Sequence, residues 1–408
     1  MKSEVFRGVS GRTATVYVGD ALTVLRELPA ESVHCCVTSP PYWGLRDYGT
    51  EPLVWGGDPG CEHEWDRKAY TVIVGRGGHG SGPGSSSTLG GNTVGAVGQQ
   101  TVSASASCLR CSAWRGSLGL ERTPEEYVAA LVAVFREVRR VLRDDGTLWL
   151  NLGDSYASNG PGSWGSSDKS TLTTGSRRGA WAPGNTIGTT SRREMAGLKP
   201  KDLVGVPWRV AFALQTDGWW LRSDIIWHKP NPLPESVTDR PTKAHEYLFL
   251  LTKSERYYYD AEAIKEPAGK PRVCGPNSRV NVDRDPAHKT AKQDAIAKRT
   301  YTGFNARYFN NPQPIFRNRR SVWTIATHPY REAHFATFPP DLVKPCVLAG
   351  CPGGGVVLDP FAGSGTTLAV AVEYKRDAIG VELNSAYVVL IGKRVRAAGV
   401  DDPLGLFD

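Results

Sequence analysis

The chain of 408 residues is longer than one average domain, so its length predicts either two domains or one large domain with insertions. No run of about 18 apolar residues occurs, which excludes a membrane-spanning helix, and the first ten residues lack the apolar core of a signal peptide. We therefore expect a cytoplasmic protein without a membrane partner. Lys and Arg number 49 against 41 Asp and Glu, and this net charge of +8 fits a polyanionic partner as well as an ordinary solvated basic surface.

Apolar patterns and helix caps predict strands and helices that alternate along most of the chain. A helix is expected from Pro124 to about Leu142, because Thr123 can cap its first turn and Glu126 can complete a capping box. The Asp145-Gly146 pair is expected to turn the chain from this helix into a strand. The predicted strands are Thr13–Val18, Val33–Val37, Thr147–Leu152, Trp220–Trp227, Glu246–Leu251, Val356–Leu358 and Asp377–Val381, and the other helices are Asp20–Leu28, one from Thr366 and one at the end of the chain. This alternation indicates an α/β fold with a parallel sheet.

Three of the eight cysteines and one histidine form a pattern typical of a metal site. Cys61-x-His63 is followed, after 44 residues, by Cys108-x-x-Cys111. The 33 residues 75–107 include 10 Gly and 7 Ser, so they are expected to form a flexible loop that needs a clamp at its base. We expect a structural zinc ion with four protein ligands and no open position for chemistry. The alternative is a set of unligated thiols in a reducing cytoplasm.

A glycine pair in the last quarter of the chain predicts a binding site for a nucleoside cofactor. The sequence Asp-Pro-Phe-Ala-Gly-Ser-Gly-Thr at 359–366 follows a predicted strand and opens a predicted helix. Its two glycines let the backbone approach a ligand, and the helix start offers free amides. Glu382 ends the next strand, 23 residues after Asp359, where dinucleotide-binding folds place an acid that binds a ribose diol. The Gly-x-Gly pair alone would equally fit an ordinary tight turn.

The sequence Thr-Ser-Pro-Pro-Tyr-Trp at 38–43 follows the predicted strand Val33–Val37. Its prolines fix the backbone and leave carbonyl groups outside any strand ladder. The carboxyl edge of an α/β sheet is also where ligands bind. A hydroxyl, a fixed carbonyl and an aromatic ring together suit a planar base that carries an amino group. The alternative is a proline-rich turn with a packing tyrosine.

These two motifs together resemble the amino-methylating DNA methyltransferases, which use S-adenosylmethionine. The tetrapeptide Ser-Pro-Pro-Tyr at 39–42 precedes the cofactor motif at 359–366, which is the order of the family's beta group. The resemblance implies an α/β fold with a circularly permuted Rossmann-like methyltransferase sheet. The expected glycine-rich and zinc-clamped insertions are not general features of the family and rest on the residues of this chain alone. The segments 224–231 and 245–247 also resemble strands and loops of the family's catalytic domain.

The resemblance implies roles for individual residues. Gly19-Asp20 is similar to the family's acid beside the cofactor adenine, and residues 334–339 are similar to a helix start that contacts the methionine end. The implied catalytic residues are Ser39, Pro40, Pro41 and Tyr42, with Trp43 lining the pocket. The implied cofactor-binding residues are Asp20, Phe335, Thr337, Asp359, Phe361, Gly363, Gly365, Thr366, Glu382 and Asn384, and the expected zinc ligands are Cys61, His63, Cys108 and Cys111.

The expected reaction is methylation of an exocyclic amino group on a base flipped out of double-stranded DNA. Hydrogen bonds to Ser39 Oγ and the Pro40 carbonyl would expose the nitrogen lone pair, while Tyr42 stacks on the base. Family members with serine at the first position mostly methylate cytosine N4, which makes cytosine N4 the expected target and adenine N6 the alternative. An RNA or protein-glutamine methylase usually carries asparagine there, and a non-catalytic DNA-binding module would not need the intact motifs. Cys346 follows a proline, as does the nucleophile of cytosine-C5 methylases, but we expect it to pack in a helix far from the base pocket.

The basic segment 264–320 is expected to recognise the DNA target, and the alternative is a solvated basic linker. It carries 13 Lys and Arg against 4 acids, a net charge of +9 that can neutralise phosphates. The expected divisions are a catalytic half at 1–55, a zinc-clamped glycine-rich insertion at 56–120, the rest of the catalytic domain at 121–263 with a flexible loop at 155–197, a target-recognition region at 264–325 and an S-adenosylmethionine-binding part at 326–408. The sequence leaves open the recognition sequence, a homodimer and a cognate restriction endonuclease as a further partner.

Overall fold

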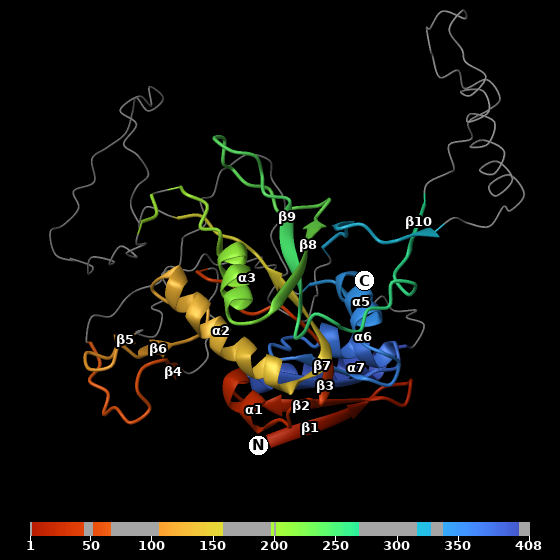
Figure 1. Cartoon of the computed structure of the whole chain (residues 1–408), viewed down its shortest axis with the longest axis horizontal. Helices are drawn as coiled ribbons and strands as arrows, with labels where there is room; N and C mark the ends of the chain where they lie inside the picture. The colour runs from red at the N-terminus through yellow and green to blue at the C-terminus, as the bar shows by residue number, and fades with distance from the viewer. Residues whose placement is uncertain are drawn as a thin grey trace, which may run out of the picture. The chain divides into compact units, whose positions relative to one another are not determined.

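The computed structural model describes residues 2–44, 52–66, 106–157, 197–199, 201–268, 316–327 and 338–399 (Figure 1). The chain divides into two compact units, one formed by Met1–Tyr259 with Ser321–Asp408 and the other by Asp260–Arg320. The larger unit contains a nine-stranded sheet in the order β1-β2-β14-β13-β3-β7-β9-β8-β12. Within the described residues, none of the helices has the length and apolar character that crossing a membrane requires.

The strands of this sheet are β1 (Lys2–Arg7), β2 (Thr13–Val18), β3 (Val33–Thr38), β7 (Leu142–Leu152), β8 (Trp220–His228), β9 (His245–Thr252), β12 (Val322–Thr324), β13 (Val356–Asp359) and β14 (Asp377–Glu382). The helices of the same unit are α1 (Ala21–Glu27), α2 (Pro124–Val141), α3 (Val206–Thr216), α5 (Pro340–Gly350), α6 (Thr366–Glu373) and α7 (Ser385–Ala397). A second, antiparallel sheet consists of β4 (Leu53–Trp55), β6 (Trp114–Gly116) and β5 (Ala106–Ser107). In the smaller unit, β10 (Glu266–Pro267) pairs with β11 (Phe316–Arg317).

Five neighbouring strands in the middle of the large sheet, β2, β14, β13, β3 and β7, run parallel. Strand β9 runs antiparallel to both β7 and β8. Strands from the two ends of the chain meet inside this sheet, since β14 pairs with β2 and β13 pairs with β3. The prediction of an α/β fold with a mostly parallel sheet is confirmed, and the carboxyl ends of the parallel strands meet at one edge.

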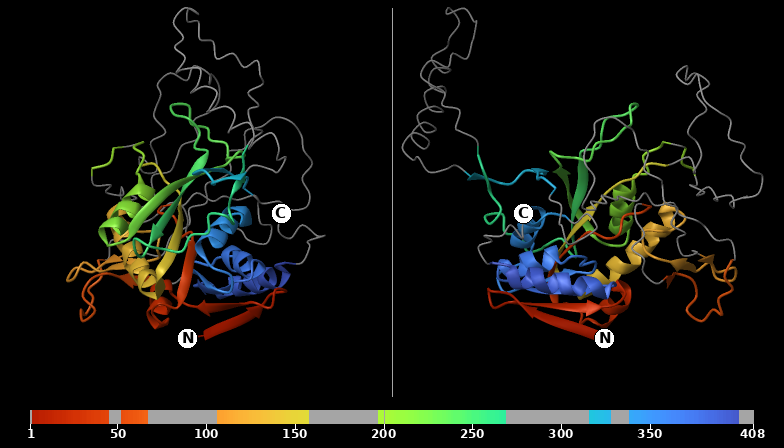
Figure 2. Two further views of the ribbon diagram at one scale, coloured as in Figure 1. Left: turned by 45° about the vertical axis from the view of Figure 1, so that its right-hand side comes forward. Right: turned by 180° about the vertical axis from the view of Figure 1, so that it is seen from behind.

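Helices cover both faces of the sheet (Figures 1 and 2). Helix α2 packs against α1 and α3, and on the other face α6 packs against α5 and α7. The predicted apolar face of α2 is confirmed, because its side chains are completely buried in the main hydrophobic core. The residues of that face are Leu131, Val134, Phe135, Val138 and Val141.

Two local predictions were wrong in the region around α2. Strand β7 already begins at Leu142, directly after the helix, and Asp145-Gly146 lies within it. The pairing with β3 passes from Val33–Leu142 to Cys35–Thr147, so the extra residues bulge out of the strand instead of forming a turn. Glu126 does not complete the capping box, because its carboxylate accepts the amide of Arg122 at 3.1 Å and not that of Thr123.

The N-cap that Thr123 forms on α2 can be tested directly by mutation. Thr123 Oγ1 accepts a hydrogen bond from the Glu126 amide at 3.2 Å. We expect Thr123→Ala to lower the free energy of unfolding by about 1 kcal/mol, because the amide then loses its partner. Thr123→Ser keeps the hydroxyl and should stay close to wild type. Urea unfolding of the three proteins measures the difference, and equal midpoints for the two variants would contradict the cap.

Candidate active site

The two predicted motifs lie side by side at the carboxyl edge of the sheet. Thr38 ends β3 and Asp359 ends β13, and these strands are neighbours. Thr38 Oγ1 donates a hydrogen bond of 2.6 Å to Asp359 Oδ1, which also accepts the Phe361 amide at 3.0 Å. Burial raises the pKa of Asp359 to about 6, against the opposing effect of these hydrogen bonds. The residue is thus an internal connection between the catalytic and cofactor loops.

The glycine turn after β13 is bound to the acid that ends β14. Gly363 (φ +51°) and Gly365 (φ +83°) both adopt the left-handed conformation that favours glycine. The amides of Gly363 and Asn384 each donate to the Glu382 carboxylate at 2.8 Å, one to each oxygen. Burial raises the pKa of Glu382 to about 7, although these amides lower it. Among the residues that the structure describes, the Phe361 carbonyl oxygen at 3.9 Å is the only atom within 4 Å of a side-chain position at Gly363, so these residues leave space beside the turn.

The other predicted cofactor residues also have structural roles. Asp20 caps α1 by accepting the Thr23 amide at 2.8 Å, and Asn384 caps α7 by accepting the Ala386 amide at 3.0 Å. Thr366 Oγ1 accepts a bond of 2.7 Å from the buried guanidinium of Arg394. Phe361 packs, partly buried, against the main core, and Phe335 and Thr337 lie outside the described residues. Contacts of these residues with a cofactor stay predictions.

A chain of polar groups leads from the predicted catalytic tetrapeptide, residues 39–42, to the Glu246 carboxylate. Ser39 Oγ lies 3.3 Å from the Tyr42 hydroxyl, and that hydroxyl lies 2.8 Å from Glu246 Oε2 and 2.9 Å from Asn151 Oδ1. Lys229 forms an ion pair with the other Glu246 oxygen. Burial, together with the negative charge of Glu246, raises the pKa of Tyr42 well above its usual range. Tyr42 is therefore a neutral phenol that can donate its proton to Glu246 or Asn151.

Neighbouring elements fix the backbone and ring of this loop. A side-chain carbon added at Gly153, just after β7, would lie 2.5 Å from the Tyr42 ring, so the ring packs directly on that glycine. Tyr127, on α2, donates a hydrogen bond of 2.8 Å to the Pro41 carbonyl. Trp43 is only 2% exposed and lies in the main core, which makes its predicted place in the base pocket wrong.

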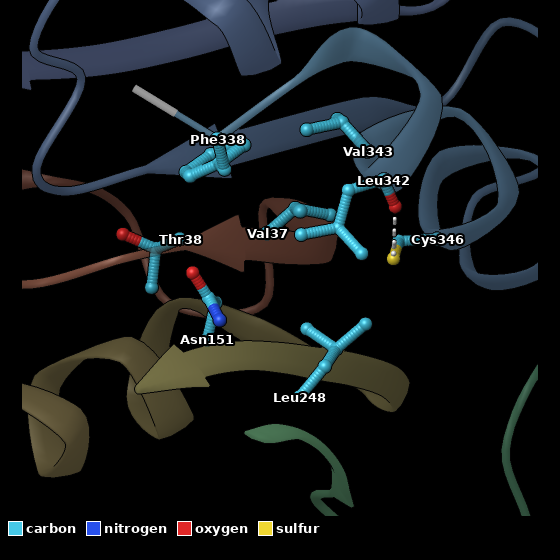
Figure 3. A pocket seen from close by; sticks show the side chains of 8 residues that line it. All are labelled: Val37, Thr38, Asn151, Leu248, Phe338, Leu342, Val343 and Cys346. Atoms are coloured by element: carbon cyan, nitrogen blue, oxygen red, sulfur yellow. Dashed lines mark hydrogen bonds between the residues drawn. The ribbon is translucent and has the colours of Figure 1, made fainter. Parts of the chain in front are cut away.

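A small pocket adjoins the start of the catalytic loop (Figure 3). Thr38 and Asn151 lie towards one end of it and Cys346, on α5, towards the other. The expectation that Cys346 packs in a helix is confirmed, since it is fully buried and donates to the Leu342 carbonyl at 3.2 Å. It lines the same small pocket as Thr38 and Asn151, because α5 packs against β3, while its distance from a flipped base stays a prediction. The pocket is lined by Val37, Thr38, Asn151, Leu248, Phe338, Leu342, Val343 and Cys346.

Asn151, Glu246 and Lys229 belong to the Tyr42 network but are not among the site residues predicted from the sequence. Asn151 interrupts the apolar run of β7 and is only 3% exposed, and such an interruption is a usable signal for a polar site. Glu246 lies in the segment 245–247, which was assigned to the catalytic domain without a role. Because β9 is antiparallel to β7, the start of β9 lies at the same edge as the end of β7.

The four predicted metal ligands come together beside the small sheet. The ligand atoms of Cys61, His63, Cys108 and Cys111 all lie within 4.8 Å of one another. The sulfurs of Cys61 and Cys108 are 3.9 Å apart, and Cys111 Sγ is 3.4 Å from His63 Nδ1. A tetrahedral zinc site has ligand–ligand edges of about 3.5–3.8 Å, whereas a disulfide bond is about 2.05 Å long. The donor atoms and their spacing therefore fit a zinc ion.

Comparison with known proteins identifies the class of this chain. The DNA methylase family of N6 and N4 methyltransferases matches residues 33–393. The chain is 38% identical over 385 residues to the type II methyltransferase M.XycI of Xanthomonas campestris pv. cyanopsidis, a match that covers 94% of this chain and 88% of that protein. It is 39% identical to the type II methyltransferase M.SmaI of Serratia marcescens, with coverage of 94% and 91%. Among solved structures, the cytosine-N4-specific PvuII DNA methyltransferase matches with a TM-score of 0.48 and 16% identity, covering 93% of this chain and 86% of that one.

The chain therefore belongs to the N6/N4 DNA methylase family. It is a DNA methyltransferase that takes its methyl group from S-adenosylmethionine, as the resemblance of the two motifs implied.

The raised pKa of Glu382 predicts how the stability of the cofactor-free protein depends on pH. The folded protein keeps a proton on Glu382 that the unfolded chain releases above its ordinary pKa of 4.5. The free energy of unfolding should therefore fall as the pH rises from 4.5 to about 7, by roughly 2 kcal/mol for this partly exposed group. Glu382→Gln cannot titrate and should flatten that fall.

Urea unfolding of both proteins between pH 4.5 and 7.5 measures this difference. Asp359 contributes a fall of the same sign in both proteins and cancels in the comparison. Parallel pH curves for wild type and Glu382→Gln would contradict the assignment.

Proposed function

We propose that this enzyme methylates cytosine N4 within a specific sequence of double-stranded DNA, on a base flipped into the site. The observation that carries this proposal is the chain from Ser39 through Tyr42 to Glu246, next to the open glycine turn. The only hydroxyl proton of Ser39 points to the Tyr42 oxygen, since the Tyr42 proton is used by Glu246 or Asn151. The Ser39 lone pairs are then left to accept a proton from an amino group.

The order of strands supports a circularly permuted sheet. Strands β13 and β14 come last in the chain, yet they lie between β2 and β3, which come first. We interpret this as the beta-group permutation of the arrangement in which the cofactor motif precedes the catalytic motif. In either arrangement β3 and β13 must be neighbours, because the Thr38–Asp359 hydrogen bond joins their ends.

The residues around the glycine turn fit the cofactor. S-adenosylmethionine, when bound, supplies the methyl group from its positively charged sulfur. Glu382 can hold the ribose hydroxyls, because its carboxylate ends β14 beside the open turn at Gly363. The left-handed backbone at Gly363 and Gly365 lets main-chain atoms approach the ligand closely.

The protein's own groups prepare the amino nitrogen and remove its proton. Hydrogen bonds from the amino group to Ser39 Oγ and the Pro40 carbonyl would draw the nitrogen away from planarity and expose its lone pair. After transfer, one amino proton passes to Ser39 Oγ, the Ser39 proton to the Tyr42 oxygen, and the Tyr42 proton to the Glu246 carboxylate. The distances of 3.3 and 2.8 Å suit this relay. Adenine N6 is the alternative target, because N1 lies beside N6 as N3 lies beside N4 in cytosine.

Recognition of the DNA sequence is proposed for the unit Asp260–Arg320 because of its basic charge. In its described part, Glu266 accepts from Arg317 at 2.8 Å and from Arg320 at 2.6 Å. These two arginines therefore stabilise the β10–β11 pair, and we expect other residues of the unit Asp260–Arg320 to contact the bases. Since the relatives named above are type II methyltransferases, we also propose a cognate restriction endonuclease as a functional partner.

We further propose that Cys61, His63, Cys108 and Cys111 bind one structural zinc ion. The edges of 3.9 and 3.4 Å and the mixed sulfur and nitrogen donors support it. Four protein ligands fill a tetrahedral site, so the ion has no part in the transfer itself.

The product of the reaction tests the proposed target. We expect nuclease digestion and mass spectrometry of treated duplex DNA to show N4-methylcytosine. Ser39→Ala should lower kcat by about 100-fold, because the amino group loses its acceptor, and should leave cofactor affinity unchanged in calorimetry. N6-methyladenine as the product would overturn the base assignment, and a fully active Ser39→Ala would overturn the relay.

Metal analysis tests the zinc site. Elemental analysis of the purified protein should give about one zinc per chain, and Cys108→Ser should lose it, because three ligands bind zinc much more weakly than four. Cys351→Ser is the matched control, since Cys351 is a buried free cysteine outside the cluster. If the purified wild-type protein contained no zinc, the proposed site would be contradicted.

A further inference from the structure

The small sheet that carries the four metal ligands lies in the chain between the catalytic loop and helix α2. The cluster brings together two parts of this insertion. Cys61 and His63 follow β4, and Cys108 and Cys111 lie between β5 and β6. Strand β6 pairs with both β4 and β5 and then continues into Ser117–Glu121, which we name the support segment. The metal ligands and the support segment thus lie at opposite ends of the three-residue strand β6.

The support segment packs against the catalytic loop. The Gly44 amide donates to the Gly119 carbonyl at 2.8 Å, and Trp43 Nε1 donates to the Glu121 carbonyl at 3.0 Å. Glu121 is fully buried, and its carboxylate accepts the Gly119 amide at 2.9 Å. A side-chain carbon at Gly119 (φ +93°) would lie only 3.1 Å from the Tyr42 carbonyl oxygen and 3.3 Å from Pro41 Cβ. The backbone of the support segment is therefore in close contact with the backbone of residues 41–44.

Trp55 Nε1 donates to the Gly116 carbonyl at 3.0 Å and Trp114 is buried, but the backbone pairing of strand β6 is short. Its pairs with β4 and β5 involve three and two residues, respectively, and a sheet of this size is marginally stable alone. The turn after Cys108 is compact, since the Cys108 amide donates to the Ala113 carbonyl at 2.7 Å. A side-chain carbon at Gly57 would lie 2.8 Å from Cys111 Sγ, so the strand end after β4 packs on the ligand turn. A metal ion bound by Cys61 and His63 after β4 and by Cys108 and Cys111 before β6 would fix β6, and with it the support segment.

We propose that the zinc site positions the catalytic loop: the ion fixes β6, and the support segment then holds Pro41–Gly44 in the geometry needed for transfer. The inference rests on the proposed function of that loop. The zinc touches neither substrate nor cofactor, so its loss should lower kcat and leave S-adenosylmethionine affinity intact. The glycine turn follows β13 and Glu382 ends β14, so neither belongs to the insertion that contains the proposed metal ligands.

Three variants test the coupling. Cys111→Ser removes a ligand. Gly119→Ala keeps the ligands but places a carbon against the catalytic loop. Gly56→Ala is the matched control, because Gly56 (φ +64°) has the same left-handed backbone in the same insertion and nothing within 4 Å of the added carbon. We expect kcat to fall by about 10-fold to 100-fold in the first two and to stay near wild type in the third.

The accompanying measurements separate positioning from simple unfolding. Calorimetry should give wild-type cofactor affinity in all three variants, and elemental analysis should find zinc in Gly119→Ala but not in Cys111→Ser. Hydrogen exchange should become faster at the Gly44 amide in Cys111→Ser, because its acceptor on the support segment is no longer held. Wild-type kcat in zinc-free Cys111→Ser or in Gly119→Ala would overturn the proposal, and so would a parallel loss of cofactor affinity.

Failure of the proposed function would look different. Total methyl transfer to DNA is the activity measured, so a wrong assignment of the base leaves the test intact. If wild-type protein methylated no DNA, the proposed function would fail, while the exchange rate of the Gly44 amide with and without zinc would still decide whether the metal holds the loop.

Discussion

A buried hydrogen bond 2.6 Å long, from Thr38 to Asp359, joins two halves of the site that are 321 residues apart in the chain. Thr38 and Asp359 are each 1% exposed, so replacing Thr38 would remove one of the hydrogen bonds that compensate the buried carboxylate, and replacing Asp359 would remove this acceptor of the buried hydroxyl. The bond holds the end of β3 beside the end of β13. The predicted catalytic tetrapeptide begins one residue beyond the end of β3, and Gly363 lies four residues beyond the end of β13, so the separation of the two loops is set by the sheet itself.

The second constraint is the direction of the hydrogen bonds around Tyr42. An ionised Glu246 carboxylate accepts hydrogen bonds and donates none, and the ion pair with Lys229 keeps an opposite charge beside it. The Tyr42 proton is drawn to that side, which turns the Ser39 hydroxyl towards Tyr42 and its lone pairs away. This arrangement leaves the Ser39 lone pairs available to accept a hydrogen bond. The Glu246 carboxylate that produces it lies on β9, which is separated from β3 by β7.

Local sequence patterns predicted the elements that depend on neighbours in the chain. The apolar face of α2, its Thr123 cap and the strands on either side of the glycine turn all follow from short-range periodicity and caps. The same patterns failed where a tertiary partner competes. Pairing with β3 extends β7 through Asp145-Gly146, and the buried core takes Trp43 away from the pocket. The packing of α5 against β3, which puts Cys346 in one small pocket with Thr38 and Asn151, was also not predicted.

By itself, the sequence determined the motifs on which the proposed chemistry depends: the Ser-Pro-Pro-Tyr loop, the glycine turn with Glu382, and four candidate metal ligands in two pairs. Such signals can be read because each depends on residue types at short, fixed spacing. Only the tertiary structure decided which of these groups meet. It added Asn151, Glu246 and Lys229 to Tyr42 and placed Gly119 behind the catalytic loop. Those contacts depend on the order and direction of strands in the sheet, which no local spacing in the chain encodes.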